Sequence, residues 1–64
     1  MNSSREMISQ YWIQDEGGMV YIYKDGSKYV IEAYDDEENM FLKADNIYQL
    51  ETAENRAKEI ALLV

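Results

Sequence analysis

Hydrophobic and polar residues alternate along the middle of the chain, in four short runs separated by turn residues. The runs cover residues 10–14, 19–24, 27–34 and 39–43 and are rich in Tyr, Ile, Val, Trp and Phe, which favour extended structure. Asp15-Glu16-Gly17-Gly18, Asp25-Gly26 and Asp35-Asp36-Glu37-Glu38 separate them, and Asp-Gly is favoured in two-residue hairpin loops. The pattern predicts an antiparallel β-meander of three or four strands.

Pairing the runs across these loops sorts the side chains onto two faces, because opposed residues of a hairpin share a face. The loops predict that Tyr21 lies opposite both Trp12 and Val30, and that Glu32 lies opposite Phe41. One face then carries Tyr11, Ile13, Val20, Ile22, Tyr29, Ile31, Ala33, Met40 and Leu42. The other carries Gln10, Trp12, Gln14, Met19, Tyr21, Tyr23, Lys28, Val30, Glu32, Tyr34, Phe41 and Lys43.

The end of the chain has the spacing of an amphipathic helix, with apolar residues at steps of three and four. We predict a helix over residues 46–63, with Asp45 or Asn46 as its cap, that packs on the aliphatic face of the sheet. A start at Thr52, with Ile47–Leu50 as a further strand, is the competing interpretation. The predicted fold is α+β, as one small domain over residues 1–64.

Residues 1–9 are compatible with two structures. Ser3 or Ser4 could cap a helix that places Met7 and Ile8 on one side, in competition with a strand from Gln10 onward. A short helical turn followed by the strand is also allowed, so the meander is assigned to residues 10–43.

Composition narrows the functional classes. Thirteen acidic residues against six basic ones give a formal charge of −7, which favours a protein partner with a basic surface and opposes direct binding of nucleic acid. The start of the chain lacks the pattern of a signal peptide, and no run reaches the ~18 apolar residues of a membrane helix. We therefore expect a cytoplasmic protein with no membrane contact.

The sequence offers little for catalysis. It has no Cys and no His, which excludes the usual nucleophile–base pairs and most transition-metal sites. Residues from Asp35 onward begin like a calcium loop, but Met40 stands at the glycine position and Asn46 replaces the bidentate glutamate. We expect no enzyme activity, no metal and no cofactor.

The second face of the sheet is the best indication of function. Tyrosine and tryptophan are frequent binding hot spots, so we predict that Trp12, Tyr21, Tyr23, Tyr34 and Phe41 contact a partner. Asp35, Asp36, Glu37 and Glu38 would steer association with its basic surface. One alternative is a homo-oligomer, such as a homodimer, whose interface is this face. A lesser alternative is stacking of single-stranded nucleic acid on the rings, helped by Lys28 and Lys43.

A short, acidic, Tyr-rich chain without Cys or His resembles small phage-encoded inhibitors of host defence or host enzymes, such as anti-CRISPR proteins, restriction inhibitors and DNA mimics. The resemblance is one of size and composition over the whole chain, without a diagnostic motif. It implies stoichiometric inhibition of a protein that handles nucleic acid, such as a host defence nuclease, because spaced carboxylates can imitate phosphates.

Overall fold

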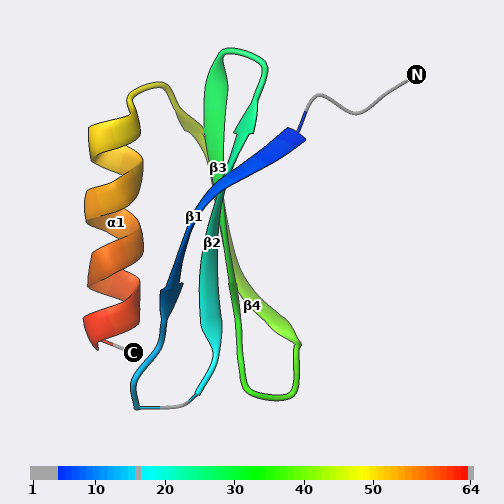
Figure 1. Ribbon diagram of the computed structural model, residues 1–64, viewed down its shortest axis with the longest axis vertical. Helices are drawn as coiled ribbons and strands as arrows, with labels where there is room; N and C mark the ends of the chain where they lie inside the picture. The colour runs from blue at the N-terminus through cyan, green and yellow to red at the C-terminus, as the bar shows by residue number, and fades with distance from the viewer. Residues whose placement is uncertain (1–4, 16, 64) are drawn as a thin grey trace.

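The four strands lie in the sheet in the order in which they occur in the chain, all antiparallel (Figure 1). The computed structural model describes residues 5–15 and 17–63. Its elements are β1 (Arg5–Trp12), β2 (Met19–Asp25), β3 (Lys28–Tyr34), β4 (Met40–Ile47) and α1 (Leu50–Leu63). The predicted α+β class is confirmed, with four strands and a C-terminal helix packed on the sheet.

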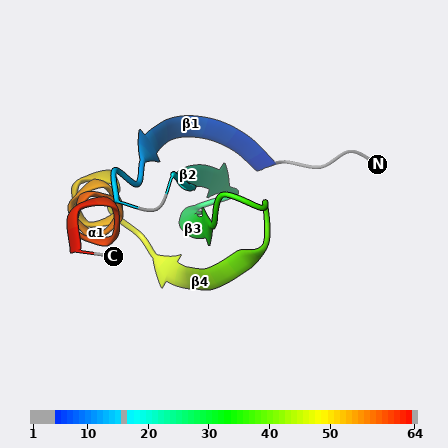
Figure 2. The same cartoon turned by 90° about the horizontal axis from the view of Figure 1, so that it is seen from below.

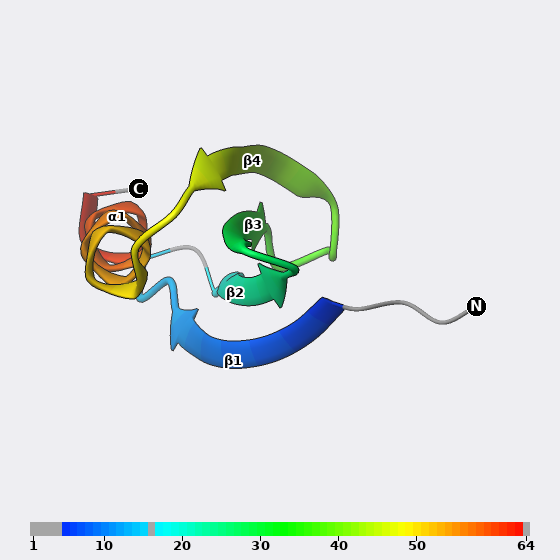
Figure 3. The same cartoon turned by 90° about the horizontal axis from the view of Figure 1, so that it is seen from above.

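The molecule has two layers, because α1 covers only one face of the sheet (Figures 2 and 3). The edge strands β1 and β4 begin on the side away from α1 and end beside it, as expected for a strongly twisted sheet. The start of β1 therefore reaches the open face, whereas its end at Trp12 approaches the helix.

The core lies between α1 and the aliphatic face of the sheet. From the sheet, Ile22 and Ile31 are fully buried, and each contributes about 1.5–3 kcal/mol through the hydrophobic effect. From the helix, three alanines at four-residue steps are buried: Ala53, Ala57 and Ala61. The fully buried positions of the helix thus carry small side chains, and Ile60 packs beside them, partly buried.

The β2–β3 turn differs from the prediction by one residue. Asp25 pairs with Lys28, so Gly26 and Ser27 form the loop in place of Asp25-Gly26. Gly26 adopts a φ of 66°, which suits glycine at the first loop position. Tyr21 therefore faces Glu32 instead of Val30, a shift of two positions that leaves every side chain on its predicted face.

The β1–β2 hairpin shows the same kind of shift. Trp12 faces Met19 and Gln10 faces Tyr21, so the predicted Trp12–Tyr21 pair is wrong. The loop runs from Ile13 to Gly18, and the Ile13 N–H donates to the Gly18 carbonyl over 2.9 Å. The loop is thus a residue earlier than predicted, and the two faces are again preserved.

The β3–β4 loop is shorter than the predicted four residues. The Asp35 N–H donates to the Asn39 carbonyl over 2.9 Å, and Glu38 has a φ of 69°, as in three-residue loops that end in the left-handed region. The register shifts next to this loop, where Met40 faces Tyr34. The predicted place of Met40 on the core face is therefore wrong, and its side chain is 45% exposed. Glu32 faces Lys43, so the predicted Glu32–Phe41 pair is wrong.

The predicted boundaries of the first strand and of the helix also differ from the structure. The chain is already extended at Arg5, so the helical interpretation of the first segment is wrong within the described residues; Ser3 and Ser4 lie outside them. At the other end, β4 continues to Ile47, which pairs with Tyr29 and fills the core, and α1 begins at Leu50. Helix starts at residue 46 and at Thr52 are both wrong.

The predicted caps are wrong for the same reason. Asn46 belongs to β4 and has a φ of 63°, so it redirects the chain before the helix instead of capping it. The Gln49 carbonyl accepts the Ala53 N–H over 3.1 Å, which places the helix start three residues later. None of the helical residues that the structure describes belongs to a segment of the length and apolar content needed to span a lipid bilayer.

Candidate functional site

The open face of the sheet carries a row of three tyrosines, which we call the tyrosine cluster: Tyr21, Tyr23 and Tyr34. Tyr21 and Tyr23 are two residues apart on β2, and Tyr34 lies on the neighbouring strand opposite Met19. The ring centroids of Tyr21 and Tyr23 are 6.2 Å apart, and those of Tyr21 and Tyr34 are 5.7 Å apart at an angle of 66°. These are favourable aromatic geometries, and all three residues keep part of their surface exposed.

A buried carboxylate, that of Glu32, lies beneath the tyrosine rings and is hydrogen-bonded to Tyr34. Glu32 faces Tyr21 across the β2–β3 pair and is only 4% exposed. Its Oε1 accepts the Tyr34 hydroxyl over 2.8 Å, and its Oε2 accepts a guanidinium N–H of Arg5 over 2.8 Å. Both carboxylate oxygens are therefore satisfied, as the burial of a charge requires.

The same contacts set the ionisation of both groups. Burial alone would raise the pKa of Glu32, but the hydrogen bonds from Tyr34 and Arg5 and the nearby positive charges outweigh it, so this pKa is lowered. The hydrogen bond to Glu32, together with burial, raises the pKa of Tyr34. Tyr34 thus stays a phenol and a donor, and Glu32 stays a carboxylate, over a wide pH range.

Arg5 shows that the tyrosine cluster accepts a guanidinium group. Its Cζ lies 4.2 Å from the centroid of the Tyr23 ring, within the range of a cation–π interaction. The same side chain is paired with Glu32. Because Arg5 lies on β1 and Glu32 on β3, this pair bridges across β2 and ties the start of the edge strand to the centre of the sheet.

The acidic turn, residues 35–38, is held in shape by its first residue. Oδ1 of Asp35 accepts the backbone N–H groups of Glu37 (2.9 Å) and Asn39 (2.8 Å). This local bonding is typical of aspartate at the start of a turn. It leaves the side chains of Asp36, Glu37 and Glu38 exposed.

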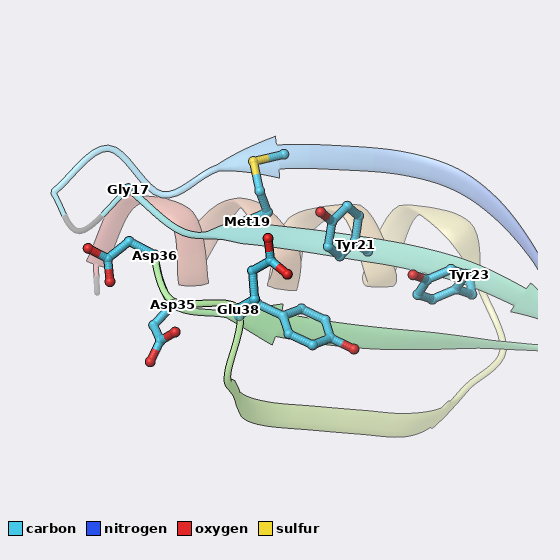
Figure 4. Close-up of a pocket in the computed structure, with 8 residues that line it drawn as sticks. Gly17, Met19, Tyr21, Tyr23, Asp35, Asp36 and Glu38 are labelled. Atoms are coloured by element: carbon cyan, nitrogen blue, oxygen red, sulfur yellow. The ribbon is translucent and has the colours of Figure 1, made fainter.

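The tyrosine cluster and the acidic turn meet in one open pocket of about 470 Å³. Figure 4 shows Tyr21 and Tyr23 side by side along one wall, with Met19, Asp36 and Glu38 toward the turn end. The full lining is Gly17, Met19, Tyr21, Tyr23, Tyr34, Asp35, Asp36 and Glu38. It contains three carboxylates and no basic residue, so the pocket is suited to a cation.

The pocket does not resemble a metal centre. Within residues 5–15 and 17–63, no group of three or more acidic side chains is arranged to hold a metal ion. The pocket is open to solvent and presents aromatic rings, phenol hydroxyls and carboxylates to a ligand.

Six of the nine predicted contact residues line this pocket: Tyr21, Tyr23, Tyr34, Asp35, Asp36 and Glu38. Trp12, Phe41 and Glu37 do not. Phe41 is 43% exposed at the irregular start of β4. Glu37 is exposed on the acidic turn.

Trp12 takes part in a different surface. It is 66% exposed and lines a second, mainly apolar groove of about 340 Å³ between the end of β1 and the end of α1. Tyr11, Gln14, Lys58, Ala61 and Leu62 complete that groove. The twist of β1 toward the helix, which alternation does not encode, explains the separation of Trp12 from the tyrosine cluster.

The sequence interpretation missed Arg5, Gly17 and Met19 as parts of the site, and it gave Glu32 no role. The predicted meander begins at residue 10, which leaves Arg5 outside it. A charged residue inside the most buried strand, as Glu32 is in β3, is the signal that could have found the network.

Comparison with known proteins gives no match: no family model, no curated protein and no solved structure matches the chain.

Proposed function

We propose that this chain is a non-enzymatic binding module that presents its tyrosine cluster and acidic turn to a basic surface of another protein. The observation that carries the proposal is the pocket in which three tyrosines and three carboxylates meet on the face that α1 leaves open. Rigid aromatic side chains supply binding area at low entropic cost, and peripheral carboxylates speed encounter with a basic surface.

The partner class that fits best is a protein that handles nucleic acid, and the proposed effect is inhibition. Such proteins carry basic grooves for phosphates, and a chain of formal charge −7 with carboxylates around an aromatic patch competes for the same groove. Inhibition by occupancy needs no chemistry in the inhibitor. This agrees with a site whose polar groups are phenol hydroxyls and carboxylates.

The test is affinity capture with the immobilised chain from a nuclease-treated bacterial lysate, read by mass spectrometry. We compare it with two charge-reversed variants, one changing Asp36, Glu37 and Glu38 to Lys and a control changing Asp45, Glu51 and Glu59 to Lys. The net charge changes equally in both, and Asp35 is kept because it holds the turn. We expect the acidic-turn variant, but not the control, to lose capture of proteins that heparin also displaces.

The captured protein is then assayed for nucleic-acid binding with added chain. Inhibition that is complete near a one-to-one ratio supports the proposal. Equal capture by the chain and the acidic-turn variant, or capture without any effect on nucleic-acid binding, contradicts it.

A homo-oligomer remains the second candidate, because apolar side chains lie exposed on both edge strands. Met7 and Ile8 are 51% and 37% exposed on β1, and Met40 and Phe41 are 45% and 43% exposed on β4. Unpaired edge strands with apolar side chains favour pairing with another copy. The mass in solution separates the two candidates.

A further inference from the structure

We infer that the tyrosine pocket binds one arginine side chain presented by the partner. The inference rests on the proposed function and deepens it, because it names the chemical group that the partner inserts.

The lining is complementary to a planar cation. The rings of Tyr21 and Tyr34 meet edge to face and border the cavity, while Glu38 and Asp36 close its turn end (Figure 4). Within the part of the chain that the structure describes, no basic side chain forms an ion pair with either of these two carboxylates. A cation that enters the pocket therefore meets negative charge that is not already neutralised.

Arg5 provides an internal example of the same recognition. Its guanidinium group lies 4.2 Å from the Tyr23 ring centroid and 2.8 Å from Oε2 of Glu32. Tyr21 is the next ring of the same strand face and lines the pocket together with the carboxylates of the acidic turn. Glu32, which lies opposite Tyr21 on β3, is buried and already paired with Arg5 and Tyr34. An incoming arginine would repeat, at Tyr21 and Glu38, the combination of ring and carboxylate that Arg5 makes at Tyr23 and Glu32.

The pocket favours arginine over lysine and over a free small molecule. A planar guanidinium stacks on rings and donates several N–H groups in one plane, whereas an ammonium is a compact, strongly hydrated charge. The pocket has a volume of about 470 Å³, which exceeds that of a single guanidinium group, and it is open on one side. A side chain reaching in from a protein surface fits this shape.

The test uses three blocked pentapeptides, acetyl-Gly-Gly-X-Gly-Gly-amide, with X as arginine, lysine or citrulline. Citrulline keeps the shape of arginine without its charge. Each is titrated into the full ¹⁵N-labelled chain at low salt, and backbone amide shifts are followed. We expect saturable shifts centred on Gly17, Met19, Tyr21 and Glu38, with a dissociation constant of about 1–10 mM for arginine. Binding should be at least about threefold weaker for lysine and undetectable for citrulline.

Two variants test the site with one matched control. Asp36→Asn with Glu38→Gln removes two charges from the pocket, Glu51→Gln with Glu59→Gln removes two from the exposed helix, and Tyr21→Leu removes the ring. We expect arginine binding to weaken at least about fivefold in the pocket variants and less than about twofold in the helix variant. An unchanged amide spectrum away from the substituted residues verifies that each variant is folded.

Equal weakening by the pocket and helix variants would show general charge attraction and would overturn the inference. Equal binding of lysine or citrulline, or shifts centred on the groove at Trp12, would overturn it as well. The two proposals fail separately. If a partner is captured equally well by the native chain, Tyr21→Leu and Asp36→Asn/Glu38→Gln, the arginine pocket is wrong and the proposed function stands. If the chain binds arginine but captures no partner, the proposed function is wrong and the arginine pocket stands.

Discussion

At the scale of single residues, Glu32 links parts of the sheet that do not touch one another directly. It lies on β3 and accepts hydrogen bonds from Tyr34 of its own strand and, across the width of β2, from Arg5 of β1. The side chain sits on the face opposite the hydrophobic core, yet it is buried. The tyrosine cluster covers it, so the binding face and the stability of the sheet share one residue.

Replacement of Glu32 by Gln should lower the free energy of unfolding by about 1–3 kcal/mol at pH 7, because a buried charge-assisted pair is lost. The loss should depend on pH in a defined direction. The folded pKa of Glu32 lies below its ordinary value of 4.5, so its contribution is present above pH 4.5 and disappears as the pH falls through the folded pKa. Urea unfolding at pH 7 and at pH 3 measures both effects.

The control is Glu59→Gln, which removes a charge from the exposed side of α1 and should change stability by less than about 0.5 kcal/mol. The native chain and Glu32→Gln share all other acidic residues, so the difference between their stabilities reports on this carboxylate. A difference that stays constant from pH 7 to pH 3 would contradict the assignment.

At the scale of the elements, the β1–β2 loop depends on Gly18 for a close approach. A Cβ atom at this position would lie 1.9 Å from the backbone oxygen of Tyr34, where nothing can move without shifting β3. Gly26 differs, since a Cβ there meets nothing within 4 Å and only its positive φ opposes substitution.

Gly18→Ala should therefore destabilise the chain by about 2–4 kcal/mol, whereas Gly26→Ala should cost only about 1 kcal/mol. Thermal unfolding followed by circular dichroism measures both. Similar losses in the two variants would show that the approach of the two loops is more adaptable than the structure indicates. Because Gly18 lies next to the pocket residues Gly17 and Met19, Gly18→Ala should also disturb their amide signals.

The faces of the sheet could be predicted from sequence because successive residues of a strand point to opposite faces. A change in pairing by two positions therefore leaves each side chain on the same face. The β1–β2 and β2–β3 hairpins each differ from the prediction by two positions in pairing, so Val20, Ile22 and Ile31 still meet the helix. At the β3–β4 loop the shift is one position, and it moves Met40 to the other face. The register could not be predicted, because it depends on turn geometry. The hydrogen bonds of Asp35 and the positive φ of Glu38 are local choices that composition does not reveal.

The site was predictable to a similar extent. Tyr21, Tyr23 and Tyr34 follow from alternation, and the acidic turn follows from its sequence. The contact of Arg5 with Glu32 joins residues 27 positions apart across two strand pairs, so no local pattern indicates it. The departure of Trp12 from the cluster follows from sheet twist, which is a property of the assembled fold.

At the scale of the whole molecule, charge opposes self-association. The formal charge of −7 is carried by a chain of 7.5 kDa, and like charges repel when two copies approach. We expect a monomer in multi-angle light scattering at micromolar concentration and about 0.15 M salt, with a mass near 7.5 kDa. A stable mass of twice that value, lost on replacement of Met7 and Ile8 by Lys, would instead favour the homo-oligomer.

The same charge separates binding of proteins from binding of nucleic acid. Exposed rings on a sheet can stack bases, but stacking acts together with neutralisation of phosphates by basic residues. Three carboxylates line the tyrosine pocket, and its lining has no Lys or Arg. A phosphate chain on this face would meet like charge at the acidic turn, so the electrostatic contribution opposes the stacking.

We therefore expect no binding of a fluorescent 12-nucleotide RNA in anisotropy titrations up to about 0.1 mM chain at 0.15 M salt, a concentration that detects the weak affinities typical of non-specific binding. Charge reversal at Asp36, Glu37 and Glu38 tests whether repulsion by the acidic turn prevents RNA binding. If repulsion by the acidic turn is what prevents stacking, this variant should gain RNA affinity that falls with added salt and is lost again with Tyr21→Leu. Binding of RNA by the native chain that weakens in Tyr21→Leu would make the tyrosine cluster a base-stacking surface. A protein partner with a basic groove would then no longer be needed to account for the exposed rings.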